Sequence, residues 1–152
     1  MALEDRVTPT LTPQMVLDIN ATELGWIRSE IVAVGSVAYF AAVDGIWKSD
    51  GTTAGTVLIK DIYPGSGATS PSRLTNVNGT VYFTADDGTH GLELWKSDGT
   101  AAGTVMVKDI NPGSAGSYFH GLTAVNGTLF FSVNDGTIGD ELWKSDGTVA
   151  LP

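Results

Sequence analysis

The sequence predicts an all-β protein: a β-propeller of four-stranded antiparallel blades, with three blades in this chain. The first observation is a repeat, because the string Trp-Lys-Ser-Asp-Gly-Thr begins at Trp47, Trp95 and Trp143, each time 48 residues further on. The second is that one repeat holds four strand-like segments of about six residues, a common strand length. The third is that residues 81–83 and 105–107 are apolar at successive positions, so both faces of a sheet must be covered. Sheets covered on both faces by like sheets are typical of propeller blades.

The middle repeat, residues 73–110, shows the predicted meander most clearly. Asn78-Gly79 separates two apolar segments and is the strongest short-range hairpin signal, since both residues tolerate the positive φ of a tight turn. No segment has the period of an amphipathic helix. The four strands are predicted over residues 73–77, 80–85, 92–97 and 104–110.

The same pattern predicts two further blades, over residues 30–62 and 121–146, so that one propeller domain spans residues 1–152. A spare segment of the fourth-strand type is predicted at residues 14–19, because residues 16–20 (Val-Leu-Asp-Ile-Asn) match residues 107–111 (Val-Lys-Asp-Ile-Asn). In the third blade, strands are predicted over residues 122–125, 128–133 and 141–145, and no fourth strand precedes Pro152.

These strands suggest how the propeller closes. Three blades are fewer than the roughly four to eight that propellers have, and an open array would expose two apolar blade faces. We therefore expect a six-bladed homodimer, in which the strand at residues 14–19 of each chain completes the third blade of the other in an isologous, swapped interface. The alternative is that the chain is a piece of a longer array.

Composition excludes several functional classes. Of the 152 residues, 42% are apolar, which excludes disorder, and 17 acidic against 8 basic residues would repel a phosphate backbone, so nucleic acid is not an expected partner. The sequence holds no apolar run near the length of about 20 residues that a membrane helix needs, so no membrane insertion is expected. The N-terminal residues do not match a signal peptide. With no cysteine, disulfides, thiolate metal sites and thiol catalysis are excluded.

The string from Glu93 to Val105 (Glu-Leu-Trp-Lys-Ser-Asp-Gly-Thr-Ala-Ala-Gly-Thr-Val), followed by Val107-Lys-Asp-Ile110 and Pro112-Gly113, resembles the bacterial ELWxxDGT repeat. The resemblance covers residues 44–148 well and residues 14–43 poorly. It implies a secreted or surface protein built from repeat arrays, generally without an assigned activity, and localisation is left open because this N-terminus lacks the signal. The strand order is more loosely similar to kelch blades. Neither resemblance implies a catalytic residue.

The segments between blades are the candidate binding region. Residues 67–73 and 115–121 differ at every position, although the strands around them match, and we expect these segments to form loops on one face of the propeller. Aromatic faces beside hydrogen-bonding groups suit sugar rings. The alternative is drift in unconstrained loops, with Trp26 and Phe119 filling gaps between blades. The candidate ligand-binding residues are Trp26, Arg28, Arg73, Tyr118, Phe119 and His120.

The loops between the second and third strands of the blades are rich in acidic residues. Such oxygen clusters could hold calcium, which takes six to eight oxygen ligands. However, Asp-Gly-Thr does not match the known calcium-loop pattern, and aspartate before glycine commonly forms a turn by bonding its own backbone. Calcium therefore stays a hypothesis, and no other cofactor is expected. The candidate calcium ligands are Asp86, Asp87, Glu93, Asp135, Asp140 and Glu141.

The sequence does not favour an enzyme. His90 and His120 fall in different repeats, and no nucleophile elbow, phosphate loop or paired-histidine metal motif is present. We expect a non-catalytic binding or scaffold module that recognises a glycan or a protein through the variable loops. The alternatives are a purely structural subunit of a larger assembly and a calcium-stabilised surface or adhesion repeat.

Overall fold

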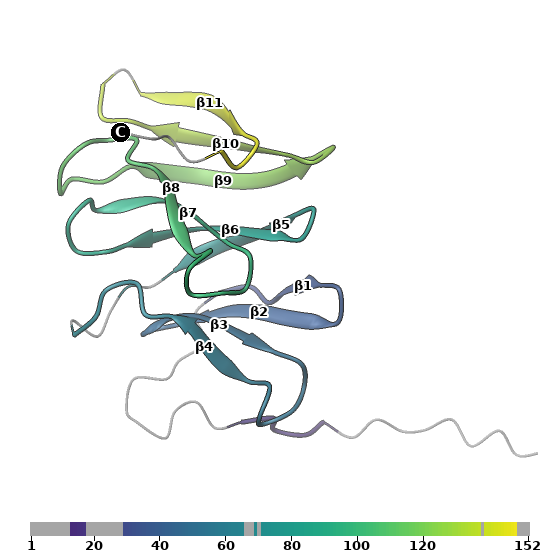
Figure 1. Ribbon diagram of the computed structural model, residues 1–152. Coiled ribbons are helices and arrows are strands. Elements are labelled where there is room, and N and C mark those ends of the chain that lie inside the picture. Colours follow the sequence, from purple (N-terminus) through teal and green to yellow (C-terminus); the bar gives the residue numbers. More distant parts are fainter. Residues whose placement is uncertain (1–12, 18–28, 66–68, 70, 138, 149–152) are drawn as a thin grey trace, which may run out of the picture.

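The computed structural model describes residues 13–17, 29–65, 69, 71–137 and 139–148. This part of the chain contains only strands, turns and loops, arranged as three antiparallel sheets, which confirms the all-β prediction (Figure 1). It includes no helix with the length and apolar character needed to cross a membrane.

The sheets follow one another along the chain, and within each sheet neighbouring strands are consecutive in sequence. The first sheet consists of β1 (Val32–Val34), β2 (Val37–Ala42), β3 (Gly45–Ser49) and β4 (Val57–Lys60). The second consists of β5 (Ser72–Val77), β6 (Thr80–Asp86), β7 (Leu92–Ser97) and β8 (Val105–Lys108). The third has three described strands, β9 (Tyr118–Val125), β10 (Thr128–Asn134) and β11 (Asp140–Ser145).

Two strand boundaries differ from the sequence-based expectation by more than one residue. β8 ends at Lys108 instead of residue 110, because the amides of Ile110 and Asn111 donate to the side chain of Glu93 and not to a neighbouring strand. β9 begins at Tyr118 instead of residue 122, because the first residues of β9 pair with the far end of β10. Residues 118–121 therefore lie in a strand, and the prediction that they form a loop is wrong.

The predicted hairpins are present. Asn78 and Gly79 both have positive φ, +52° and +92°, and Asn126 and Gly127 repeat this conformation between β9 and β10. Positive φ at both central residues is what a tight turn between twisted strands requires. Asparagine and glycine at these positions thus join the first two strands of the second and third sheets.

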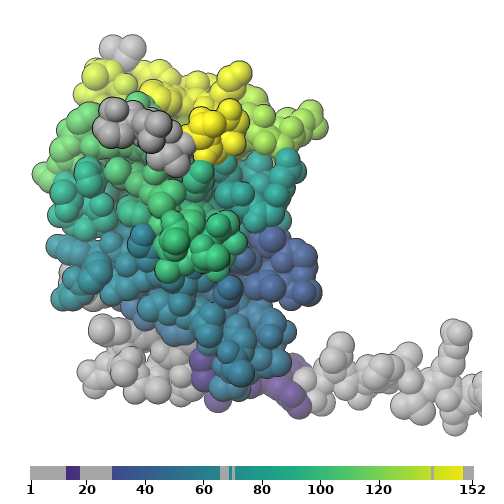
Figure 2. All heavy atoms as spheres, in the orientation of Figure 1, coloured from purple at the N-terminus to yellow at the C-terminus, as the bar shows by residue number. Residues whose placement is uncertain are grey.

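The sheets stack face to face in chain order, as the successive colour bands of Figure 2 show. Along β6, Val81, Phe83 and Ala85 are buried against the first sheet, whereas Tyr82 belongs to the core between the second and third sheets. Because successive side chains of a strand point to opposite faces, this run of apolar residues fills two cores at once. The expectation that both faces of the middle sheet are covered is confirmed.

The Trp-Lys-Ser-Asp-Gly-Thr motif links each sheet to the next. Lys48 Nζ donates to the backbone oxygen of Gly99 over 2.9 Å, and Lys96 Nζ donates in the same way to Gly147, 48 residues further on. A Cβ built on Gly99 would lie 2.4 Å from the hydroxyl oxygen of Tyr39, which is too close for any side chain. This turn therefore needs glycine for the close approach of Tyr39 as well as for its positive φ. The lysine of one motif therefore binds the glycine turn of the next.

The aspartate of the motif shapes that turn. Asp98 Oδ1 accepts the backbone N–H of Thr100 over 2.9 Å and its hydroxyl over 2.7 Å, and Asp50 and Asp146 do the same with the threonine two residues on. The hydroxyl and amide of Thr100 hold the pKa of Asp98 below its ordinary value. Trp47 and Trp143 pack on aromatic neighbours in their own sheets, with ring centres 6.4 Å from those of Phe40 and Phe131, and Trp95 is buried in the core between the first and second sheets. Packing and turn formation account for the repeated aspartate and tryptophan.

The first strands of the sheets lie side by side. The Asn76 side-chain amide of β5 donates to the backbone oxygen of Ala33 in β1 over 2.7 Å, and Thr75 Oγ1 donates to Leu122 in β9 over 3.4 Å. Adjacent first strands are the arrangement expected around the axis of a propeller. The described sheets form an open stack and not a closed ring.

The N-terminal segment lies against the outer face of the first sheet (purple in Figures 1 and 2). Residues 13–17 form no strand, and Thr53 Oγ1 donates to the backbone oxygen of Val16 over 2.9 Å. Val16 and Leu17 line a groove with Phe40 and Ser49. The last two residues of the strand predicted at 14–19 lie outside the described residues.

Candidate functional site

The loops between the second and third strands, together with the linkers between sheets, lie on one side of the stack, at the left in Figure 1. We call this side the loop rim and define it by the described residues among 43–44, 61–71, 86–91, 109–117 and 134–139. The Asn-Gly hairpins lie on the opposite side. Each linker is bound to the preceding sheet, since Thr69 N donates to Val43 O over 3.1 Å and Ser117 N donates to Leu92 O over 2.8 Å.

One close backbone approach holds the rim between the second and third sheets. Gly91 has φ +71°, and a Cβ on it would lie 2.5 Å from the nitrogen of Gly116; a Cβ on Gly116, φ +67°, would lie 2.2 Å from the nitrogen of Leu92. Only glycine at both positions permits this contact. The linker is therefore packed directly on the loop beneath it.

Glu93 fixes the same linker from within. Its carboxylate is fully buried and accepts the N–H of Ile110 over 2.9 Å, the N–H of Asn111 over 3.2 Å and the hydroxyl of Ser117 over 2.9 Å. Burial raises the pKa of Glu93 above its ordinary value, against the effect of these hydrogen bonds, and the negative charge of Asp109 acts in the same direction as burial. Protein donors thus occupy this carboxylate, which the sequence suggested as a calcium ligand.

Glu141 holds the corresponding position in the third sheet, 48 residues after Glu93. Its Oε2 atom is buried and has no hydrogen-bond partner in the described structure. The donors that Glu93 finds come from the residues after the fourth strand of its sheet, and the described residues contain no fourth strand for the third sheet. The third sheet therefore has an acceptor without its donors.

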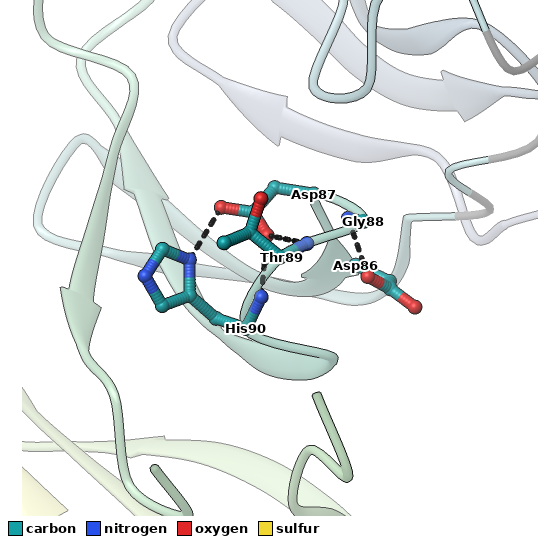
Figure 3. Close-up of polar contacts among 5 residues, drawn as sticks. All are labelled: Asp86, Asp87, Gly88, Thr89 and His90. Atoms are coloured by element: carbon teal, nitrogen blue, oxygen red, sulfur yellow. Dashed lines mark hydrogen bonds and ion pairs between the residues drawn. The ribbon is translucent and has the colours of Figure 1, made fainter. Parts of the chain in front are cut away.

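Asp87 and His90 form a hydrogen-bonded pair on the rim (Figure 3). Asp87 Oδ2 lies 2.8 Å from His90 Nδ1, and Asp87 Oδ1 accepts the N–H groups of Thr89 and His90, both over 2.9 Å. Partial burial acts to raise the pKa of Asp87, but the hydrogen bonds from His90 and Thr89 together lower it. The hydrogen bond to Asp87 raises the pKa of His90, and burial opposes it only in part.

The remaining acidic candidates shape local turns or lie apart. Asp86 Oδ1 accepts the N–H of Gly88 over 2.7 Å, Asp135 Oδ1 accepts the N–H and hydroxyl of Thr137, and exposed Asp140 lies 3.2 Å from His120. Among the described residues, no group of three or more histidine, aspartate or glutamate side chains is placed to share a metal ion. The structure therefore does not assemble the six acidic candidates into a calcium site.

The aromatic candidates divide into two groups. Tyr118 is 67% exposed and His120 is also exposed, at the end of β9 that meets the rim. Phe119, between them, is buried, with its ring centre 5.9 Å from that of Phe131, in the core between the second and third sheets. Phe119 therefore fills the gap between two sheets, as the alternative interpretation of these loops expected.

The other candidates add little to a common surface. Arg73 is half-buried in β5 with φ +56°, at an irregularity in the pairing of β5 with β6. Trp26 and Arg28 lie outside the described residues. Of the six predicted ligand-binding residues, the structure brings together Tyr118 and His120, with Asp140 beside them.

Sequence reasoning missed two functional features of the fold: the role of Glu93 as an acceptor inside the rim, and the lysine-to-glycine link between sheets. A signal for the first was present, because a glutamate recurs at positions 93 and 141, each time directly before Leu-Trp. No protein-family model, curated protein or solved structure matches this chain. The chemistry of the rim is therefore inferred from its own residues.

Because of the Asp87–His90 pair, we expect the free energy of unfolding to depend on pH. Because the folded-state pKa of His90 is raised above 6.5, its ordinary value, the pair stabilises the protein fully below that value and loses this effect as pH rises through the folded-state pKa. The free energy of unfolding, measured by urea titration from about pH 5 to about pH 9, should fall less steeply in His90→Gln than in the unchanged protein. Asp87→Asn should reduce the slope similarly, and the double variant should add nothing; parallel curves would contradict the pair.

Removal of the Glu93 carboxylate should destabilise the protein strongly. Glu93→Ala leaves three donors without an acceptor, at about 1–3 kcal/mol each, so we expect a loss of roughly 3 kcal/mol or more in the free energy of unfolding. Ser117→Ala removes one donor only and should cost about 1 kcal/mol, which keeps the measurement possible if Glu93→Ala does not fold. Equal, small losses in denaturant titrations of both variants would show that the buried carboxylate does not hold the linker.

Proposed function

We propose that this protein is a non-catalytic binding or scaffold module, in which the stacked sheets are the scaffold and the loop rim recognises a glycan or a protein. One contrast within the chain supports it. The lysine-to-glycine link is the same at both sheet junctions, whereas residues 67–73 and 115–121, which lead in sequence into β5 and β9, differ at every position. A repeated framework with varied connecting segments is typical of proteins that bind through loops on a rigid scaffold.

The exposed end of the third sheet offers the chemistry that such binding needs. Tyr118 presents an aromatic ring to solvent, and His120 and Asp140, 3.2 Å apart, supply hydrogen-bonding groups beside it. The apolar C–H face of a sugar stacks on an aromatic ring while its hydroxyls bond to polar neighbours. The carboxylates of Asp87 and Glu93 are occupied by groups of this chain, which supports a non-catalytic role.

We further propose that the three sheets are blades of a β-propeller, which two copies of the chain close into a six-bladed ring. The exposed apolar side chains at both ends of the stack favour this: Ile31 beside the first sheet and Leu142 on the third, which is 77% exposed. Leu94, the counterpart of Leu142 in the second sheet, is 1% exposed under the third sheet. Apolar surface of this kind commonly marks an interface with another protein surface.

Recognition at the rim is testable on a glycan array. If the rim binds sugars, the unchanged protein should bind a defined class of glycan, and Tyr118→Ala should lose this binding because the exposed ring is removed. Val125→Ala, also exposed on β9 but at the hairpin end opposite the rim, is the control and should bind normally. Absence of glycan binding, or equal binding by all three proteins, would count against a glycan ligand and favour the structural role.

Closure of the ring is testable by solution mass. Sedimentation velocity or light scattering of the purified chain should give the mass of two copies. Leu142→Asp places a charge on the outer face of the third sheet and should give the mass of one copy, whereas Thr89→Asp, at an exposed rim position after β6 of the second sheet, should leave two copies together. A one-copy mass for the unchanged protein would refute the ring.

A further inference from the structure

We propose that the segment around Met15 and Val16 of a second copy of this chain adds to the outer edge of β11 as the fourth strand of the third sheet. The inference rests on the two-copy ring proposed above and identifies the strand that each copy would give to the other. Three features support it: the sequence of the N-terminal segment, the unpaired outer edge of β11, and polar groups at both ends of the stack.

The N-terminal segment resembles β8 and the residues that follow it. Met15 and Val16 correspond to Met106 and Val107, and Asp18-Ile19-Asn20 repeats Asp109-Ile110-Asn111. In β8 these two side chains serve opposite faces, since Met106 packs on the core between the first and second sheets and Val107 lies in the core between the second and third. A strand with this sequence therefore joins two neighbouring cores.

Residues 16 and 17 already make the contacts that such a strand forms with one of its two neighbouring sheets. Val16 and Leu17 line a groove with Phe40 and Ser49 of the first sheet. The counterparts of these four residues line a groove together between the second and third sheets: Val107, Lys108, Phe131 and Ser145. The segment thus lies against the first sheet much as β8 lies against the third.

The second neighbouring sheet is absent in the described part of the single chain. Met15 is 79% exposed, whereas Met106, its counterpart, is half-buried and directly opposite Trp95 of β7. The exposed side chain of Met15 therefore lacks the neighbouring strand that β7 provides for Met106. β11 is such a strand, because Trp143 stands at the position of Trp95.

The outer edge of β11 is open to receive a strand. β7 pairs with β8 through Trp95 opposite Met106 and Lys96 opposite Val105, but the corresponding residues of β11, Trp143 and Lys144, pair only with β10 in the described structure. Beside this edge lies a groove of about 430 Å³, whose apolar lining includes Leu94, Phe131 and Trp143. In the register of the β7–β8 pair, Met15 of the second copy faces Trp143 and enters this groove.

Polar groups at the two ends also match. Glu141 lacks the two amide donors that Glu93 receives from Ile110 and Asn111, and the N-terminal sequence has Ile19 and Asn20 at these positions. Lys144, at the position of the lysines that bind Gly99 and Gly147, is exposed. The hydroxyl of Tyr39 lies close to Gly99 and that of Tyr82 lies close to Gly147. The equivalent glycine of the first sheet, Gly51, has only open space at this position. The repeat pattern thus supplies two amide donors for Glu141 from the N-terminal sequence and a glycine acceptor for Lys144 from the turn of the first motif.

A disulfide between copies tests this register directly. The chain has no cysteine, so Gln14→Cys combined with Lys144→Cys introduces two thiols only. Their counterparts, Val105 and Lys96, are directly opposite in the β7–β8 pair, where Cα atoms lie about 4.5–5.5 Å apart, within the range that a disulfide spans. Within one chain these sites are at opposite ends of the stack, since residues 13–17 lie at the first sheet and β11 lies in the third (Figure 1). Mild oxidation should therefore give a covalent dimer and no internally linked monomer.

The control moves one thiol along β11. Asp140 lies four residues before Lys144, about 13 Å away along the strand, so Gln14→Cys with Asp140→Cys should not cross-link. As a second readout, Met15→Asp should give a one-copy mass in light scattering, because it places a charge in the groove, and Met15→Leu should keep two copies together.

The outcomes separate the two proposals. A covalent dimer from the Lys144 pair alone, with loss of association in Met15→Asp, supports the exchanged strand. A two-copy mass without this selective cross-link overturns the strand exchange and leaves the ring standing. A one-copy mass for the unchanged protein, or an internally linked monomer, overturns both.

Discussion

The structure depends on sheets that are apolar on both faces. Val81 and Phe83 face the first sheet while Tyr82 lies toward the third, so β6 is stable only between two neighbours. Burial of one such side chain contributes about 1.5–3 kcal/mol, and a sheet with an uncovered face loses this for several residues together. Each sheet is therefore stable only when it is stacked on its neighbours. In an open stack, the outer faces of the first and last sheets lose the free energy that burial would provide.

The repeated motif directs this stacking. Burial alone does not decide how one sheet lies on the next, because hydrophobic contact has no direction. The hydrogen bond from Lys48 to Gly99 does have one, and the close approach of Tyr39 to the same glycine fixes the distance between the sheets. Since every motif contains both the lysine donor and the glycine acceptor, each sheet can link to a preceding and a following sheet. Lys144 and Gly51 are the donor and the acceptor site at the two ends.

The rim combines a fixed backbone with variable side chains. The contact between Gly91 and Gly116 and the buried carboxylate of Glu93 hold the linker before β9, so Tyr118 is presented from a defined position. Acidic residues that resemble metal ligands in the sequence serve turns and linkers here, because a carboxylate beside free backbone N–H groups bonds to them first. Asp87 illustrates this, with two amides and a histidine already bound to it.

The sequence by itself determined the hairpins and the strands, apart from the end of β8 and the start of β9, since side-chain alternation and the positive φ of Asn78-Gly79 are local properties that act within a few residues. It also showed that both faces of the sheets must be covered. Only the tertiary structure decided that Phe119 is buried beside exposed Tyr118, that Glu93 binds the amides after β8, and that Lys48 reaches Gly99. The contacts of Glu93 and Lys48 join residues 17 to 51 positions apart, and they arise when one sheet or linker is laid on another. No local preference encodes such a meeting, because it depends on the distance and angle at which whole sheets pack.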